Sequence, residues 1–307
     1  MTQASAPAPV TLVTGDAGFV GRHVLAEIPG CVGLSGLCPD IDIRDRAALV
    51  ACLEAVRPAR VIHLAAQSFV PESFRDPETT FAVNFTGTFR LLEALQATGF
   101  SGRMLFVGTG DVYGPVAAHE LPLTEDRPLR PANPYAVSKV AAEALCGQWS
   151  RSAGFEIVMV RPFNHIGPGQ PATFAVSDFA RQIAEIRHGR RPPALTVGNI
   201  DVTRDFTDVA DVVRAYGMLL ATGANGEVYN VCSGVERSIR GIVERLLHLS
   251  GTEARIETDP ARYRPADQPR VFGDNGKLVS ATGWRPEIPF EETLNKIYTY
   301  WEQQIGK

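Results

Sequence analysis

The feature that most constrains the fold lies at residues 10–21, where an apolar, β-branched run leads directly into three spaced glycines. The segment reads VTLVTGDAGFVG, and its glycines are Gly15, Gly18 and Gly21. This GxxGxxG spacing allows a tight turn and lets backbone N–H groups approach a pyrophosphate at a helix N-terminus. Because residues 19–28 have helical spacing, the segment predicts a strand, a phosphate-binding loop and a helix, which begin a dinucleotide-binding domain.

Strand-like and helix-like patterns continue to alternate along the first half of the chain. The expected strands are residues 10–15, 31–37, 59–66, 104–107, 155–162 and 227–234. The expected helices are residues 19–28, 44–56, 80–97, 134–150, 176–187 and 208–220. Such alternation indicates βαβ units and a parallel sheet, and continuously apolar strands indicate that both faces of the sheet are covered. The predicted fold class is α/β, a Rossmann-type doubly wound parallel sheet.

The alternation stops after Pro162, where proline and glycine become dense. We therefore expect a smaller, discontinuous α/β substrate lobe. The predicted division assigns residues 10–163 and about 204–233 to the dinucleotide-binding domain, and residues 164–203 and 234–307 to the lobe. Residues 1–9, MTQASAPAP, are small and proline-rich and are expected to form a flexible leader.

Composition and charge exclude several classes of function. The 307 residues are 45% hydrophobic and 21% charged, which is ordinary for a globular protein. A net charge of −4, with dispersed basic residues, gives no electrostatic case for nucleic-acid binding. No apolar run approaches the ~20 residues of a membrane span, and the N-terminus does not resemble a secretory signal. The five cysteines have no CxxC spacing, which indicates reduced thiols in a cytoplasmic protein, and no metal site is expected.

The segment around the second expected strand bears on the choice of dinucleotide. An acidic residue at the end of this strand usually accepts a hydrogen bond from the adenosine ribose, but the segment GLSGLCP offers only Ser35. Arg22, just after the third glycine, can either approach a 2′-phosphate or face solvent. Asp42 can either accept a hydrogen bond from the adenine amine or cap the next helix. The choice between NADH and NADPH is therefore left open.

Tyr135 and Lys139 form the candidate proton-transfer pair. They lie at positions i and i+4 of NPYAVSKVAAE, which places them on one face of the expected helix. The lysine charge favours the phenolate and is expected to lower the pKa of Tyr135, so that the phenol can exchange a proton with a carbinol oxygen. Thr109 follows the strand at residues 104–107, in the segment GTGDVYG, and would hold that oxygen.

These segments together make the chain resemble the extended short-chain dehydrogenase/reductase family over nearly its whole length. The matching segments are GxxGxxG at 15–21, DIRD at 42–45, HLAA at 63–66, NFTGT at 84–88, VYG at 112–114 and the YxxxK motif. The resemblance implies hydride transfer with NAD(P)H and a catalytic triad of Thr109, Tyr135 and Lys139. It also implies that Asn84 belongs to a structural and proton-relay set, the alternative being a hydrogen bond within its own helix. The implied cofactor contacts are Gly15, Gly18, Phe19, Val20, Gly21, Asp42, Ile43, Leu64, Ala65, Ala66, Val107, Tyr135, Lys139, Pro162 and His165.

The second half is similar, more narrowly, to the GDP-mannose 4,6-dehydratase and GDP-4-keto-6-deoxymannose reductase group. The matching segments are RPFNHIGPGQ (161–170), RDFTDVADVV (204–213), VYNVCSG (228–234), RYRPAD (262–267) and TGWRPEIPFEETL (282–294). The first and third are most similar to the reductase branch. The resemblance implies a GDP-linked 6-deoxyhexose as substrate. The implied substrate contacts are Thr109, Gly110, Asp111, Asn164, Arg204, Arg264 and Asp267.

The residue types fit a nucleotide sugar. Arg204 and Arg264 carry guanidinium groups suited to a pyrophosphate, since these can donate two parallel hydrogen bonds. Asp267 can accept from both ribose hydroxyls, and Asn164 can donate to a phosphate.

Three residues in the second half of the chain have more than one possible role. Arg204 can instead form an ion pair with Asp205 or Asp208. His165 is interpreted as a backbone contributor to the carboxamide site or a packing residue, and not as a general acid or base. Asp178 can accept from N1 and N2 of guanine, or belong to a solvated helix face.

Asp111 bears on the choice between dehydration and reduction of the sugar. The dehydratases that the chain resembles carry a glutamate at this position, which removes the C5 proton. Aspartate is one methylene shorter, a deficit of ~1.5 Å, whereas proton abstraction needs heavy atoms within ~2.6–3.2 Å. We therefore expect an NAD(P)H-dependent reductase that converts GDP-4-keto-6-deoxy-D-mannose to GDP-D-rhamnose. This reaction would serve nucleotide-sugar and polysaccharide biosynthesis. We also expect the protein to be a homodimer. The alternatives are a GDP-mannose 4,6-dehydratase, a reductase that gives GDP-6-deoxy-D-talose, and a non-catalytic NAD(P)-sensing protein.

Overall fold

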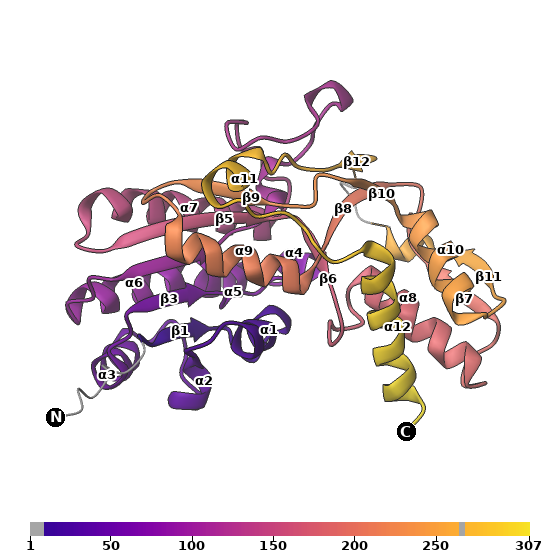
Figure 1. Ribbon diagram of the computed structural model, residues 1–307, viewed down its shortest axis with the longest axis horizontal. Coiled ribbons are helices and arrows are strands. Elements are labelled where there is room, and N and C mark those ends of the chain that lie inside the picture. The colour runs from indigo at the N-terminus through magenta and orange to yellow at the C-terminus, as the bar shows by residue number, and fades with distance from the viewer. Residues whose placement is uncertain (1–8, 264–267) are drawn as a thin grey trace. The chain divides into compact units, whose positions relative to one another are not determined.

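The computed structural model describes residues 9–263 and 268–307, and the chain divides into two units (Figure 1). Unit 1 consists of the chain up to Val112 together with Asn133–Arg161 and Val213–Tyr229. Unit 2 consists of Tyr113–Ala132, Pro162–Val212 and Asn230–Lys307. The predicted leader at residues 1–9 lies, apart from its last residue, outside the described residues.

The secondary structure follows the alternation expected from the sequence. The strands of the described residues are β1 (Thr11–Thr14), β2 (Cys31–Gly33), β3 (Arg60–His63), β4 (Arg103–Val107), β5 (Glu156–Pro162), β6 (Asn164–Ile166), β7 (Ala194–Val197), β8 (Thr203–Asp208), β9 (Val228–Val231), β10 (Glu236–Ser238), β11 (Arg255–Thr258) and β12 (Arg270–Val271). The α-helices of the same residues are α1 (Phe19–Glu27), α2 (Leu34–Leu37), α3 (Arg46–Val56), α4 (Val70–Arg75), α5 (Pro77–Phe81), α6 (Gly87–Ala97), α7 (Pro134–Ser152), α8 (Ala175–Arg187), α9 (Val209–Thr222), α10 (Ile239–Ser250), α11 (Gly276–Thr282) and α12 (Phe290–Ile305).

Unit 1 is built on a six-stranded sheet in the order β2-β1-β3-β4-β5-β9. The pairings from β2 through β5 are parallel, and the predicted doubly wound α/β fold is confirmed. Alternate side chains of the strands, such as Leu12, Val61 and Met104, form one core with apolar residues of α3, α6 and α7. The intervening side chains, such as Val13 and Ile62, are also buried, and Figure 1 shows α9, in orange, in front of this sheet.

Two predicted elements of unit 1 differ from the structure. The strand expected over residues 31–37 ends at Gly33, and residues 34–37 form α2. A Cβ atom on Gly33 would overlap the carboxylate of Asp16, so the strand end lies directly against another segment. The helix expected over residues 80–97 contains a π-helical turn at Ala82–Thr86 between α5 and α6. Such turns occur frequently at functional sites.

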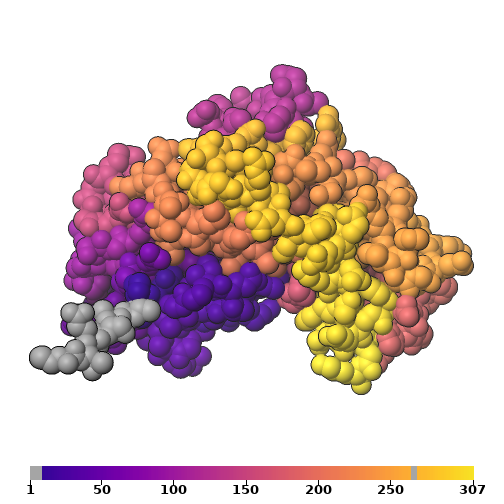
Figure 2. All heavy atoms as spheres, in the orientation of Figure 1, coloured from indigo at the N-terminus to yellow at the C-terminus, as the bar shows by residue number. Residues whose placement is uncertain are grey.

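Unit 2 contains a small sheet and a group of helices. Strand β8 pairs with β6, β10 and β12, and β7 pairs with β11. Helices α8, α10 and α12 pack together through buried residues that include Phe179, Leu246 and Leu294. In Figure 2 the yellow atoms of α12 lie beside those of α8. Within the described residues, none of the helices has the combined length and apolar character that a membrane span requires.

The observed division differs from the predicted one mainly at residues 113–132 and 204–212, and also at 162–163 and 230–233, all of which belong to unit 2. Leu123 explains the first difference, because its N–H donates to Phe272 O (3.1 Å) and its carbonyl accepts from Asp274 N (2.9 Å). The pairing of β8 with the strands of unit 2 explains the second. Both differences depend on pairings between distant segments, which a local pattern does not reveal.

Candidate active site

The glycine loop lies tightly against the end of β3. Gly15 has a φ of +71°, and a Cβ atom there would lie 2.6 Å from the backbone nitrogen of Ala65. A Cβ atom on Gly21 would overlap the carbonyl oxygen of Gly15, so neither position accepts a side chain. Helix α1 begins at Phe19 with no acidic residue in its first turn. The first N–H groups of a helix have no partner within the helix, so the start of α1 is suited to the pyrophosphate of a dinucleotide.

The expected adenine-side residues flank the start of α3. Asp42 accepts from Arg44 through the backbone N–H and Nε (both 2.9 Å) and through Nη2 (2.5 Å). These hydrogen bonds lower the pKa of Asp42. The helix-cap alternative for Asp42 is wrong, because Asp45 caps α3 by accepting from the N–H groups of Ala47 and Ala48.

Other predicted cofactor residues lie nearby. The side chain of Ile43 is buried, and a Cβ atom on Gly87 would lie 2.7 Å from its Cγ2 atom. Arg22 is exposed and donates to the carbonyl oxygen of Ala17 in the glycine loop (2.7 Å). Leu64 and the two alanines after it are half-buried.

Lys139 is buried beside the end of β4. Its side chain is 3% exposed, and its Nζ atom donates to the carbonyl oxygen of Val107 (2.8 Å). The ammonium group also lies 5.1 Å from the centroid of the Phe106 ring. Burial lowers the pKa of Lys139 to about 8. The ammonium is therefore anchored two residues before Thr109 and remains mostly protonated at neutral pH.

Tyr135 begins the same helix and is 8% exposed. Burial raises the pKa of Tyr135, and the charge of Asp111 raises it further, whereas a hydrogen bond with Thr109 lowers it. The expected net lowering of the Tyr135 pKa is therefore wrong for this structure, because desolvation and the nearby Asp111 carboxylate raise it. The phenol stays protonated at neutral pH, which is the form that a proton donor requires.

The structure brings together, within unit 1, the side chains of Thr109, Asp111, Tyr135 and Lys139. Thr109 is buried, and its Oγ1 atom accepts from the N–H of Asp111 (3.2 Å). Gly110 and Asp111 begin a short 3₁₀ turn, and Asp111 is exposed. Gly108 allows the close approach of β5, because its N–H donates to Val160 O (2.8 Å) and a Cβ atom would lie 2.8 Å from the same oxygen.

A buried chain of hydrogen bonds crosses the carboxyl ends of β1 and β3. The Thr88 hydroxyl donates to the carbonyl oxygen of Asn84 (2.6 Å), so the hydroxyl oxygen of Thr88 must accept the hydrogen bond from His63 Nε2 (2.9 Å). His63 Nδ1 then accepts from the Thr14 hydroxyl (2.7 Å), which itself accepts from Ala65 N (3.2 Å). The chain of donors and acceptors therefore fixes a neutral His63 with its proton on Nε2. Burial lowers the pKa of His63 to about 3.

Asn84 continues this chain to α7, the helix that carries Tyr135 and Lys139. Its side chain accepts from Gln67 N (2.8 Å) and donates to the Ser138 hydroxyl (2.9 Å). Ser138 in turn donates to the carbonyl oxygen of Tyr135 (2.7 Å). The alternative of a side-chain hydrogen bond within its own helix is therefore wrong for Asn84. The sequence analysis missed His63 and Ser138, although a histidine at the end of an apolar strand is a usable signal.

A buried ion pair joins α7 to β5. Arg161 donates to Glu143 through Nε (2.9 Å) and Nη2 (2.6 Å), and both side chains are buried. Glu143 lies one turn after Lys139 on α7. The sequence analysis missed this pair, because its members are 18 residues apart and belong to different elements.

The expected substrate residues of unit 2 lie on β6 and β8. Asn164 is exposed, and its amide donates to the carbonyl oxygen of Asp205 (3.2 Å). Arg204 donates through Nη1 to Thr203 O and Gln268 O (both 2.7 Å). Pro162 is buried at the end of β5. The carbonyl of His165 accepts from Gln170 (3.0 Å).

The predicted ion-pair alternative for Arg204 is not formed. Asp205 is buried and accepts from the N–H and hydroxyl of Ser233 (2.9 and 2.6 Å) and from Gly234 N (2.9 Å). Asp208 accepts from Ala210 N (2.8 Å) and the Thr293 hydroxyl (2.7 Å). Both aspartates therefore bind their own neighbours. The predicted Arg264 and Asp267 lie outside the described residues.

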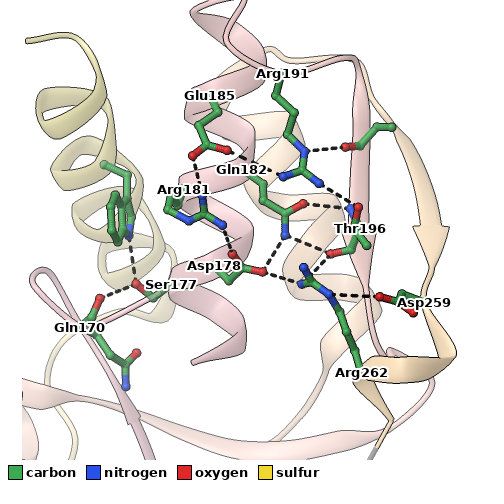
Figure 3. A network of polar contacts seen from close by, with 12 residues as sticks. Gln170, Ser177, Asp178, Arg181, Gln182, Glu185, Arg191, Thr196, Asp259 and Arg262 are labelled. Atoms are coloured by element: carbon green, nitrogen blue, oxygen red, sulfur yellow. Dashed lines mark hydrogen bonds and ion pairs between the residues drawn. The ribbon is translucent and has the colours of Figure 1, made fainter. Parts of the chain in front are cut away.

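Asp178 is the centre of a polar network in unit 2 (Figure 3). The side chain is 7% exposed, and it accepts from Arg181 (2.6 Å), Gln182 (2.7 Å) and Arg262 (2.8 Å). The alternative of a solvated helix face is therefore wrong, and three protein donors already hold the carboxylate proposed for guanine. Arg262 also donates to Thr196 O (3.2 Å), so the network fixes the chain just before residues 264–267.

Comparison with known proteins agrees with this site. The sequence matches the GDP-mannose 4,6 dehydratase family over residues 38–297. The chain belongs to this family. GDP-6-deoxy-D-mannose reductase from Pseudomonas aeruginosa is 47% identical over 296 residues, which are 95% of this chain and 97% of the relative. The resemblance inferred from the sequence is confirmed.

Solved structures extend the comparison to the fold. RMD from Pseudomonas aeruginosa, complexed with NADPH, has a TM-score of 0.90 and 45% identity and covers 96% of this chain and 99% of its own. UDP-glucose 4-epimerase from Thermus thermophilus, in complex with NAD, has a TM-score of 0.83 and 29% identity and covers 95% of this chain and 98% of its own. Solved structures of this fold are thus found with either dinucleotide.

Proposed function

We propose that this protein is an NAD(P)H-dependent oxidoreductase that reduces the C4 ketone of GDP-4-keto-6-deoxy-D-mannose and forms GDP-D-rhamnose. The observation that carries the proposal is the buried group of Thr109, Tyr135 and Lys139 in the same unit as a glycine loop whose close packing suits a pyrophosphate. The 47% identity with GDP-6-deoxy-D-mannose reductase supports the choice of substrate. The structure of RMD with NADPH supports a nicotinamide cofactor.

The geometry supports a one-step reduction. When held at the glycine loop, a nicotinamide cofactor would supply the hydride for C4 of the sugar. Tyr135 donates its proton to the ketone oxygen, and its burial keeps the phenol protonated until that oxygen becomes basic. Thr109 donates a hydrogen bond to the same oxygen. Lys139 lies one helical turn from Tyr135, and its positive charge stabilises the phenolate that remains.

The remaining roles are proposed from the resemblance and the local geometry. In unit 1 the glycine loop and the first turn of α1 would hold the pyrophosphate, Asp42 and Ile43 would contact the adenine side, and the residues after β3 would flank the loop. In unit 2, Asn164 and Arg204 are proposed to bind phosphate groups of the nucleotide sugar. The roles of Pro162 and His165 toward the carboxamide, the homodimer and the cytoplasmic location stay predictions.

The dehydratase is the second candidate, because the family is described as GDP-mannose 4,6 dehydratase and because Asp111 acts on the pKa of Tyr135. The short reach of aspartate favours the reductase. Incubation with GDP-mannose in deuterated water separates the two activities. A reductase leaves GDP-mannose unchanged, whereas a dehydratase incorporates solvent deuterium at C5.

The direct experiment combines the 4-keto nucleotide sugar with NADH or NADPH and follows the loss of nicotinamide absorbance. Tyr135→Phe should reduce turnover by ~10²–10⁴, because the proton donor is removed while the ring remains. Cofactor affinity should change little. Turnover by the wild type excludes the non-catalytic sensor, and near-normal turnover by the Phe variant would refute the role of Tyr135.

A further inference from the structure

A carboxylate from the glycine loop lies at the end of β2. Asp16 is 7% exposed, and its Oδ1 and Oδ2 atoms accept from the backbone N–H (3.1 Å) and the hydroxyl (2.5 Å) of Ser35. A Cβ atom on Gly33 would overlap Oδ2, so the carboxylate fills the space directly beside the strand end. Ser35 itself is exposed. A ligand at this edge of the sheet can therefore reach the Asp16–Ser35 pair.

The Asp16–Ser35 pair lies where dinucleotide-binding folds usually bind the adenosine ribose. The acidic residue that accepts from the ribose 2′-OH usually stands about 20 residues after the glycine loop, at the end of the second strand. Ser35 stands at that distance from Gly15. Because β1 and β2 are parallel, with Val13 opposite Gly33, the glycine loop and the end of β2 lie at the same edge. The carboxylate that is missing from β2 is thus supplied by the loop.

We propose that Asp16, acting with Ser35, selects NADH over NADPH, an inference that rests on the proposed function. The Ser35 hydroxyl donates its proton to Asp16, so it can only accept a hydrogen bond from the cofactor. A ribose 2′-OH can donate that hydrogen bond, whereas the oxygens of a 2′-phosphate cannot. A phosphate monoester also carries a charge of about −1.5 to −2 at neutral pH, which the Asp16 carboxylate repels.

The neighbouring basic side chains do not form a phosphate pocket around this pair. In the part of the chain that the structure describes, Asp16 and Ser35 bond to each other and to no arginine or lysine. Arg22 extends to the carbonyl of Ala17, and Arg44 forms its ion pair with Asp42. The inference therefore sets this chain apart from RMD of Pseudomonas aeruginosa, whose structure is complexed with NADPH.

The test compares the binding of ADP-ribose and 2′-phospho-ADP-ribose by titration calorimetry, which requires no turnover. The wild type should bind ADP-ribose at least 30-fold more tightly. Asp16→Asn, which removes the charge but keeps the shape, should reduce this ratio at least tenfold, or about 1.4 kcal/mol. Ser35→Ala should lower the ratio in the same direction, and because Ser35 is exposed this variant preserves the fold. Glu54→Gln removes an exposed charge from α3 and should leave the ratio unchanged.

Two results would overturn the inference: a wild type that binds both fragments equally or prefers the 2′-phosphate, or the same ratio in the wild type and in both variants. The outcome is separable from that of the proposed function. Faster ketone reduction with NADPH than with NADH would support the reductase and refute selection by Asp16. A fragment ratio as predicted, without any turnover of the 4-keto sugar, would refute the reductase and leave the selection in place.

Discussion

Replacing His63 by glutamine tests the buried hydrogen-bond chain beside the glycine loop. Burial, together with the nearby charge of Lys139, lowers the pKa of His63 to about 3. In the unfolded chain a histidine titrates near ~6.5. Glutamine can accept from Thr14 and donate to Thr88 in the same arrangement, but it does not titrate. The comparison therefore isolates the cost of protonating this one side chain.

The sign follows from proton binding in the two states. Between pH 6.5 and 3 the unfolded chain binds a proton at His63 and the folded protein does not, so the free energy of unfolding falls as the pH falls. At pH 4.5 the unfolded histidine is two pH units below its pKa, which corresponds to a loss of about 3 kcal/mol. Above pH 6.5 this loss is absent.

The assay is urea-induced unfolding of the wild type and His63→Gln at pH 7.5 and pH 4.5. The variant should be the less stable protein at pH 7.5, because its amide does not reproduce the ring geometry. At pH 4.5 the difference in unfolding free energy should shift in favour of the variant by about 3 kcal/mol. His119→Gln, at an exposed position, is the matched control and should produce no such shift. An identical difference between the wild type and His63→Gln at both pH values would refute the reasoning.

Three further substitutions test other contacts. Glu143→Ala removes the carboxylate that pairs with the buried Arg161 guanidinium and should lower the unfolding free energy by about 3–5 kcal/mol in urea titrations; a loss under 1 kcal/mol would contradict the buried pair. Asp178→Asn weakens the hydrogen bond that holds Arg262 and should raise the KM for the nucleotide sugar about tenfold, or about 1.4 kcal/mol. The cofactor affinity should not change, and equal losses of affinity for both ligands would indicate a general disruption of the fold. Arg204→Ala should weaken binding of the nucleotide sugar by about 1.5–3 kcal/mol in calorimetry, and unchanged binding would remove Arg204 from the substrate site.

The glycine loop, most of the strands of the sheet and the Tyr135–Lys139 helix could be predicted from the sequence, because each depends on residues close together in the chain. A strand followed by three spaced glycines has few alternatives, and residues four apart on a helix share a face. Thr109 was placed near this pair because it follows the strand at residues 104–107. The glycine loop, the strands and the helix are local features, and the structure contains them.

Asp16 shows why the rest could not be predicted. In the sequence it is an unremarkable residue between two glycines, and its significance comes from Ser35, 19 positions away. The contact lies just after the end of β2 at Gly33, whereas the apolar pattern predicted a longer strand. The pairing of strands in the sheet determines which strand end lies beside the glycine loop. The pattern of apolar residues does not show which residues pair.

The pKa of Tyr135 also could not be predicted from the sequence spacing of Tyr135 and Lys139. The i, i+4 relation to Lys139 suggested a lowered value, but burial and the Asp111 carboxylate raise it. Desolvation depends on everything packed around the phenol, which becomes known only when the fold is complete. For a reductase the raised value is useful, because the phenol must hold its proton until the ketone oxygen accepts it.

The most direct test of the central claim follows a deuterium atom from the nicotinamide C4 position of the reduced cofactor. The labelled cofactor and GDP-4-keto-6-deoxy-D-mannose are incubated with the wild-type protein, and the product is examined by NMR. We expect one deuterium at C4 of a sugar with the configuration of D-rhamnose and none at C5. A product with the 6-deoxy-talose configuration, or a sugar that carries no deuterium from the cofactor, would contradict the proposed reduction.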